Sequence, residues 1–165
     1  MHSNYESFGS VEYDFRAFRL YIGQPTEFPS PLKRSLMIQP GHEHFIDLTH
    51  QVFSTSGINN LSPDIRNCYF RTEGDLSYYD EYTYTNCMLE CGIKGAEKIV
   101  GCIPWYLPRG ENSSVCDPWN TKQFRKQLGQ AEENSSFCAH CLPDCEFIKT
   151  TATTSSARFR LKWNR

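Results

Sequence analysis

The chain has 165 residues and a formal net charge of −2, and 22% of its residues are charged. This length suits a single domain, whole or incomplete. The near-neutral charge gives no reason to expect binding to nucleic acid or to an anionic membrane surface. No apolar run approaches the ~18–20 residues that cross a bilayer, and the first residues lack the charged and apolar regions of a signal peptide.

The first part of the chain is predicted to form β-strands separated by turns. Residues 11–22 alternate imperfectly between apolar and polar side chains, and the second half of this stretch is predicted to be a strand. Prolines at positions 25, 29 and 31 then end it, because proline has no N–H group for a central ladder. Further strands are predicted at residues 36–38 and 44–53, on either side of the Pro40-Gly41 turn. A polar loop follows over residues 54–63.

Two helices are predicted next, and the first covers residues 78–100. Gly92 and Gly95 weaken its middle by up to ~1 kcal/mol each. Asp117-Pro118 reads as an N-cap followed by proline at the first helical position, so a second helix is predicted over residues 119–130. Residues 146–150 and 156–163 are predicted to be strands, with a Thr/Ser run between them. The side chains predicted to face inward from the first helix are Tyr84, Cys87, Met88, Cys91 and Ile99.

Eight cysteines, an even number, indicate a disulfide framework and an oxidising compartment. Cys87 and Cys91 share a helix face with Cβ atoms about 5–6 Å apart, whereas a disulfide needs about 3.5–4.5 Å. We therefore expect each to pair with another segment, and Cys138 and Cys141 offer one. Eight cysteines allow on the order of 100 pairings. The set that we favour is an antiparallel ladder with an outer rung and a tip loop: Cys91–Cys138, Cys87–Cys141, Cys68–Cys145 and Cys102–Cys116.

Three signatures carry a resemblance to a known family. They are Tyr84-x-x-Cys87-x-x-x-Cys91, Gly101-Cys-Ile-Pro-Trp-Tyr-Leu-Pro108 and Cys141-Leu-Pro-Asp-Cys145. Their spacing, residue types and order resemble the thumb of the extracellular domain in the degenerin, epithelial sodium channel and acid-sensing ion channel family, in its arthropod pickpocket-like branch. The resemblance covers roughly residues 11–165 and implies the same nested disulfide pairing.

The resemblance also implies a fold class, α+β, with antiparallel palm-type strands and a disulfide-stapled two-helix thumb. The expected divisions are palm-type strands and a wrist loop over residues 1–67, the thumb over 68–145, and a return strand over 146–165. The family's thumb usually carries five bridges, and this chain has cysteines for four. Val100 and Phe124 stand where we place the missing pair.

The function implied by the resemblance is that of a piece of a larger channel. We expect a plasma-membrane protein whose extracellular side includes this chain, assembled as a homo- or heterotrimer with other channel subunits. Sodium ions would pass through transmembrane helices that this chain lacks, and no cofactor is expected. The family's acid-sensing members place carboxylates on the second thumb helix, whereas residues 121–126 here are basic, so proton sensing is not carried over.

Three Asn-x-Ser sequons support an extracellular placement, and they begin at Asn60, Asn112 and Asn134. The second and third lie in polar segments beside cysteines, which suits surface loops. We expect these asparagines to carry glycans if the chain matures in the secretory pathway.

Other interpretations of the same residues compete with this one. A secreted Cys-rich binding protein without a membrane partner is the main alternative. The Cys-x-His140-Cys motif, with Cys87 and Cys91, could form a zinc site to which His42 and His44 add ligands, but Cys102 and Cys116 would be left over. His42 and His44 are instead expected to be exposed on one face of a strand. A Cys-x-x-Cys redox centre lacks its usual βαβ context, and no nucleophile, base and oxyanion set indicates an enzyme.

Acidic residues gather just before the first helix, at positions 73, 75, 80 and 81. Clustered carboxylates can raise one another's pKa and so sense protons. A solvated face that benefits from the dipole of the following helix is the more common arrangement, and it is the one we expect.

Overall fold

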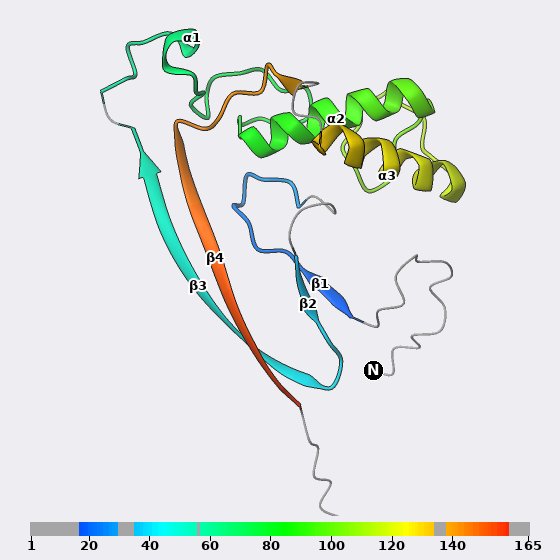
Figure 1. The fold of residues 1–165 in the computed structure, drawn as a ribbon. Coiled ribbons are helices and arrows are strands. Elements are labelled where there is room, and N and C mark those ends of the chain that lie inside the picture. Colours follow the sequence, from blue (N-terminus) through cyan, green and yellow to red (C-terminus); the bar gives the residue numbers. More distant parts are fainter. Residues whose placement is uncertain (1–16, 30–34, 56, 134–137, 159–165) are drawn as a thin grey trace, which may run out of the picture. The chain divides into compact units, whose positions relative to one another are not determined.

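A computed structural model describes residues 17–29, 35–55, 57–133 and 138–158. The fold class is α+β, as predicted, with two small two-stranded sheets and three helices in the described part of the chain (Figure 1). The described residues divide into two compact units, one of residues 17–23, 35–50 and 150–158, the other of residues 24–29, 51–55, 57–133 and 138–149. Along the chain the elements are β1 (Phe18–Leu20), β2 (Leu36–Ile38), β3 (His42–Ser54), α1 (Pro63–Arg66), α2 (Tyr84–Val100), α3 (Pro118–Glu133) and β4 (Glu146–Arg158).

The strands β1 and β2 form an antiparallel pair, and both were predicted. Arg19 lies opposite Met37 at the centre of the pair. Past β2, the Pro40-Gly41 turn leads directly into β3, and Gly41 takes a φ of +75°, which favours glycine.

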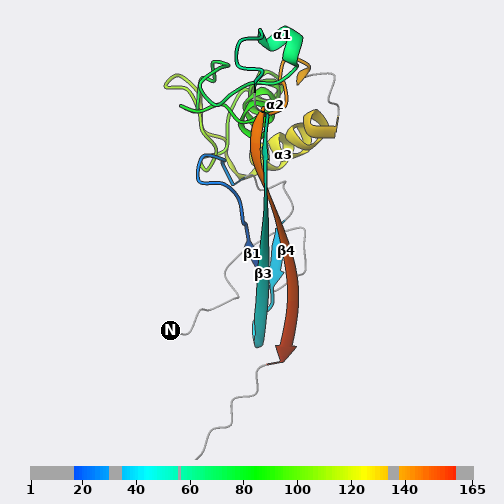
Figure 2. The same ribbon diagram turned by 90° about the vertical axis from the view of Figure 1, so that its left-hand side faces the viewer.

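The longest strands, β3 and β4, have 13 residues each, pair with each other and run in opposite directions (Figure 2). The prediction of two strands separated by a Thr/Ser run between residues 150 and 156 was wrong, because β4 continues to Arg158 without a break. Threonine is β-branched and suits a pleated strand, so a threonine run extends a strand more readily than it ends one. The part of the second predicted strand after residue 158 lies outside the described residues.

Helix α2 begins at Tyr84, six residues later than predicted, because Thr83 caps it. The Thr83 hydroxyl accepts a hydrogen bond from the N–H of Asn86 at 3.0 Å. The helix ends at Gly101, whose φ of +80° lets its N–H reach the carbonyl of Glu97 at 2.7 Å. Helix α3 begins as predicted behind Asp117, whose carboxylate accepts the N–H of Asn120 at 2.7 Å.

Helix α2 lies between two groups of buried side chains. Its Leu89, Ile93 and Ala96 face α3 and the loop after α2, and they meet Phe124 and Leu128 in the larger hydrophobic cluster. Figures 1 and 2 show α2 and α3 side by side. The second cluster lies on another face of α2 and consists of Tyr82 and four cysteines, Cys87, Cys91, Cys138 and Cys141.

The inward face of α2 was only partly predicted. Cys87 and Cys91 are buried, but Tyr84 and Ile99 are 40% and 63% exposed. They miss the core because α3 packs on the face of Leu89 and Ile93, and that face has its own i, i+4 spacing. Phe124, one of the two positions assigned to a missing bridge, is fully buried in this cluster, and Val100 packs against the cluster.

Gly92 lets α2 and α3 approach each other closely. A Cβ atom added at Gly92 would lie 2.8 Å from Cδ1 of Leu128 on α3, a distance that requires a shift. Gly129 on α3 has no atom within 4 Å of such a Cβ. Packing against α3 therefore favours glycine at position 92. No such close contact favours glycine at position 129.

These two glycines give a paired stability test. Gly129→Ala should raise the free energy of unfolding by up to about 1 kcal/mol, because alanine is the better helix former and nothing obstructs it. Gly92→Ala should gain little or none of this, and Gly92→Val should lower the free energy by about 1–3 kcal/mol through overpacking. Denaturant unfolding of the oxidised chain measures both. Equal stabilisation by alanine at the two positions would contradict the close approach.

Candidate functional site

Two disulfides join α2 to the turn before β4. Cys87 is bonded to Cys141 and Cys91 to Cys138, with Cα–Cα distances of 5.7 and 6.0 Å. The turn is closed by a hydrogen bond from the N–H of Cys141 to the carbonyl of Cys138 at 2.9 Å. Cys138 and Cys141, three residues apart in the turn, thus pair with Cys91 and Cys87, four residues apart on the helix. The two pairs run antiparallel, which is the order that the sequence analysis favoured.

The third disulfide, Cys102–Cys116, closes the loop that follows α2, and its Cα atoms are 5.0 Å apart. Ile103 and Val115 form a bridge inside this loop, with the N–H of Ile103 bonded to the carbonyl of Ser114 at 2.8 Å. Ile103 is fully buried while Trp105 is 74% exposed. The loop therefore contributes one side to the core and presents the other to solvent.

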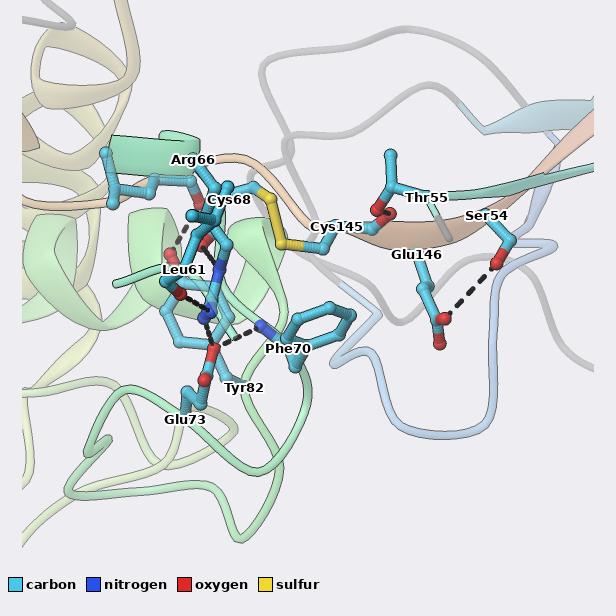
Figure 3. Close-up of a disulfide and its surroundings, with 11 residues drawn as sticks. Ser54, Thr55, Leu61, Arg66, Cys68, Phe70, Glu73, Tyr82, Cys145 and Glu146 are labelled. Carbon is cyan, nitrogen blue, oxygen red and sulfur yellow. Dashed lines mark hydrogen bonds and ion pairs between the residues drawn. A yellow bond between two sulfur atoms is a disulfide. The ribbon is translucent and has the colours of Figure 1, made fainter. Parts of the chain in front are cut away.

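The fourth disulfide, Cys68–Cys145, connects the loop before α2 to the start of β4 (Figure 3). Backbone hydrogen bonds accompany it: the N–H of Cys145 donates to the carbonyl of Tyr69, and the N–H of Tyr69 donates to that of Pro143, both at 2.9 Å. The hydroxyl of Thr55, just past β3, donates to the carbonyl of Cys145 at 2.9 Å. This disulfide thus lies where β3 and β4 enter the helical part of the chain.

Arg66 is the buried charge next to this disulfide, with 2% of its side chain exposed. Its guanidinium donates to the carbonyls of Cys68 at 3.0 Å and Leu61 at 2.6 Å and forms an ion pair with Glu73. The same group lies 4.7 Å from the centre of the Phe70 ring. Figure 3 shows Arg66 and Glu73 on the Cys68 side of the disulfide and Thr55 on the Cys145 side. Such a charge is tolerated inside a protein because its donors are paired.

Glu90 on α2 holds the loop before the helix in place. Its carboxylate accepts the N–H groups of Ser77 at 2.9 Å and Tyr78 at 3.0 Å, and the ammonium of Lys94 at 2.6 Å. Burial by itself raises the pKa of this carboxyl, but the hydrogen bonds from Lys94, Ser77 and Tyr78 outweigh burial, so that the pKa is lowered. These bonds also explain the late start of α2, since residues 77 and 78 are bound to the helix and do not extend it.

Asp144 caps the first turn of α2 from the opposite side. Its carboxylate accepts the N–H of Tyr84 at 2.9 Å, which places a negative charge at the positive end of the helix. One residue before the N-cap, the Tyr82 hydroxyl donates to the carbonyl of Leu142 at 2.6 Å, and burial followed by the charge of Asp144 raises the pKa of Tyr82. The Cys141-Leu-Pro-Asp-Cys145 signature therefore accepts hydrogen bonds from Tyr82 and Tyr84 at the start of α2.

A cleft of about 400 Å³ lies along α2, and Glu90 and Lys94 line it together with Tyr69, Tyr82 and His140. Among the described residues, His140, Cys87 and Cys141 form the single group of three potential metal ligands, with ligand atoms within 4.8 Å of one another. The two sulfur atoms are bonded to each other, so neither is a thiolate that could hold zinc. The histidines His42 and His44 belong to the other unit, half-buried on β3 with ring centres 6.2 Å apart.

The four acidic positions before α2 do not act as one group. Glu73 pairs with Arg66, and Glu81 lies 3.6 Å from Arg71. Asp75 and Asp80 are exposed. The sequons also differ in placement, since Asn60 and Asn112 are exposed in loops and Asn134 lies outside the described residues.

Comparison with known proteins identifies the family. A family model described as "Amiloride-sensitive sodium channel" matches residues 1–165. The chain belongs to this family. It is similar to Pickpocket protein 28 of Drosophila melanogaster, at 31% identity over 147 residues, which are 85% of this chain and 24% of that protein. It is also similar to the Sodium channel protein Nach of Drosophila virilis, at 31% over 103 residues (62% and 27%), and of Drosophila melanogaster, at 30% over 141 residues (82% and 26%).

The resemblance to the pickpocket-like branch of the amiloride-sensitive channels is thus confirmed. The chain spans about a quarter of the length of these curated relatives. Among the residues that the structure describes, no helix is both long enough and apolar enough to cross a membrane.

The sequence analysis did not identify the buried polar side chains on and around α2. Asn86 and Glu90 are 0% and 4% exposed, and Arg66 is equally enclosed. The sequence carries no signal for the Asn86 side chain, because the Thr83 hydroxyl caps the backbone N–H of the third helical residue whatever its side chain is. For Glu90 the sequence offers only an i, i+4 pairing with Lys94, which is typical of exposed helix faces as well.

The lowered pKa of Glu90 predicts a pH-dependent stability. Because the folded pKa lies below the unfolded value of about 4.3, the contribution of Glu90 is complete above that value and is lost as pH falls through the folded pKa. At pH 7, Glu90→Gln should lower the free energy of unfolding by about 1–3 kcal/mol. The difference from wild type should shrink below about pH 4.

Denaturant unfolding between pH 7 and pH 3 measures this difference. Glu97→Gln makes the same change in charge elsewhere on α2 and is the control. It should be less destabilising than Glu90→Gln at pH 7. If Glu90→Gln were equally destabilising at every pH, the carboxylate would not be the source of the effect.

Proposed function

We propose that this chain is part of the extracellular region of a sodium-permeable cation channel and that its helical module passes movement to the strands β3 and β4. The module, residues 55–145, is inserted between these two paired strands. The observation that carries the proposal is the junction at Cys68–Cys145, where a disulfide, the Arg66–Glu73 ion pair and the Thr55 hydroxyl converge. A displacement of the helices is transmitted to the strands there, because the junction contains a covalent bond.

The proposed setting follows from the family. Residues 1–67 and 146–165 would supply palm-type strands and the wrist loop, and residues 68–145 would be the thumb. The channel would be a plasma-membrane trimer, homomeric or heteromeric, whose transmembrane helices conduct sodium and whose thumb lies on the extracellular side. The chain would need no cofactor and perform no catalysis. A parent transcript with apolar segments of about 20 residues supports this setting, whereas a cleavable signal peptide without them favours a secreted binding protein.

Extracellular maturation predicts glycans at Asn112 and Asn134, with Asn60 as a third acceptor. Expression of the full-length protein in cells, followed by glycosidase treatment, should increase gel mobility. Asn112→Gln and Asn134→Gln should each remove one step of the shift, while Asn59→Gln, next to a sequon but outside it, should remove none. A protein whose mobility does not respond to glycosidase would count against the extracellular placement.

The transmission proposal predicts unequal roles for the disulfides. Loss of one native bridge typically lowers the free energy of unfolding by about 2–5 kcal/mol. This loss is expected for Cys68–Cys145 and for Cys102–Cys116 alike. Replacing Cys68 and Cys145 together by serine also uncouples the strands, so it should reduce whole-cell current or surface expression more than replacing Cys102 and Cys116. Surface labelling beside each current measurement separates gating from delivery.

Non-reducing peptide mapping of the wild-type protein is the control for this comparison. It should recover the four pairs Cys68–Cys145, Cys87–Cys141, Cys91–Cys138 and Cys102–Cys116. A peptide that links Cys138 to Cys141 would rule out the ladder, and equal loss of current in the two double variants would rule out the special role of the junction.

A further inference from the structure

The connection between β1 and β2 contains a segment that lies on the helical module. We call residues 24–29 the strap. At its start, Gln24 donates through Nε2 to the carbonyl of Ile148 at 3.2 Å and accepts through Oε1 from Arg71 at 2.8 Å. These contacts reach β4 and the loop before α2. The strap thus ties the β1–β2 connection to the module by hydrogen bonds, without a disulfide.

Asn86 on α2 binds the backbone of the strap at two points. Its Oδ1 accepts the N–H of Phe28 at 3.0 Å, and its Nδ2 donates to the carbonyl of Thr26 at 2.7 Å. The side chain is fully buried, and the Thr83 hydroxyl fixes the backbone N–H of Asn86 at 3.0 Å. One amide therefore satisfies both a donor and an acceptor of the strap backbone. The strap is itself closed into a turn by the N–H of Glu27, which donates to the carbonyl of Gln24 at 3.1 Å.

A further hydrogen bond joins the strap to α2, from the hydroxyl of Thr85 to Oε1 of Glu27 at 3.3 Å. The ring of Phe28 packs beside the larger hydrophobic cluster and lies 6.3 Å from the ring of Tyr79. The hydroxyls of Thr26 and Tyr79 are buried without a hydrogen-bond partner among the described residues. The Thr26 hydroxyl belongs to the strap, so its burial without a partner disfavours the closed arrangement, since release of the strap would return this hydroxyl to water.

We propose that the strap is a releasable latch between the β1–β2 connection and the thumb, and that Asn86 is the positioning residue that holds it closed. The disulfides keep the module intact whether the strap is bound or free. The latch adds a contact that a stimulus can break and re-form. This inference rests on the proposed function in one respect: a latch between thumb and strands affects current only if the chain belongs to a working channel.

The latch is tested by hydrogen exchange on the oxidised 165-residue chain, followed amide by amide with NMR. Asn86→Ala removes two hydrogen bonds, so exchange at the Phe28 amide should accelerate by about tenfold or more. The amides of Leu89 and Ile93 in α2 should keep their rates. Thr26→Val removes the unpartnered buried hydroxyl of the strap itself, so exchange at Phe28 should slow, the opposite direction.

Asn120→Ala is the matched control. Asn120 is the third residue of α3, as Asn86 is of α2, and its N–H is likewise bound by the N-cap side chain. This variant should leave exchange at Phe28 unchanged. Asn86→Asp keeps the acceptor for Phe28 and loses the donor to Thr26, so it should give an intermediate acceleration without loosening α2.

The outcomes separate the latch from the channel. The latch is supported if exchange accelerates more at the Phe28 amide than at the Leu89 amide. It is overturned if, in both Asn86 variants, exchange at Phe28 does not accelerate or accelerates only as much as at Leu89. These rates are measured without current, so that failure would leave the proposed channel function untouched. Conversely, a full-length protein with no sodium current would overturn the proposed function and leave the exchange result standing.

Discussion

The structure depends on the covalent attachment of α2 to the turn at residues 138–141. The larger cluster is assembled from aliphatic and aromatic side chains, but the second consists mainly of the cysteines themselves. Without the two disulfides that second face of α2 would have no core. A closed loop of about 50 residues contributes roughly 4 kcal/mol in the chain-entropy account, which is a large share of a small domain's stability.

Polar side chains fix the course of the segment between Cys68 and α2, which lies between disulfide-bonded cysteines. Residues 69–83 form no helix or extended strand. Their backbone groups are bound by the carboxylates of Glu90 and Glu73 and by a hydrogen bond from the N–H of Tyr82 to the carbonyl of Arg71. Buried polar groups are stable only when they are paired. In this module they fix the course of a long irregular segment, and the helix serves as its template.

The sequence was most informative where geometry leaves few choices. Four-residue spacing on a helix forbids a bond between Cys87 and Cys91, and the structure places both opposite the Cys138–Cys141 turn. It was less informative for Leu89, Ile93 and Ala96, whose i, i+4, i+7 spacing competes with the cysteine spacing on the same helix. Asn86 could not be assigned from the sequence, since its partners are backbone groups about 60 positions away.

The nesting of the disulfides has a consequence for biosynthesis. The bridged cysteines are separated by 14, 47, 54 and 77 residues, each bridge enclosed by the next. A chain that emerges from its N-terminus exposes Cys68, Cys87 and Cys91 long before their partners are synthesised, and only Cys102 and Cys116 can pair early. Three thiols must therefore stay reduced while the tip loop and α3 form. The early growth of α2, which keeps Cys87 and Cys91 from bonding to each other, protects the nascent chain from a wrong crosslink.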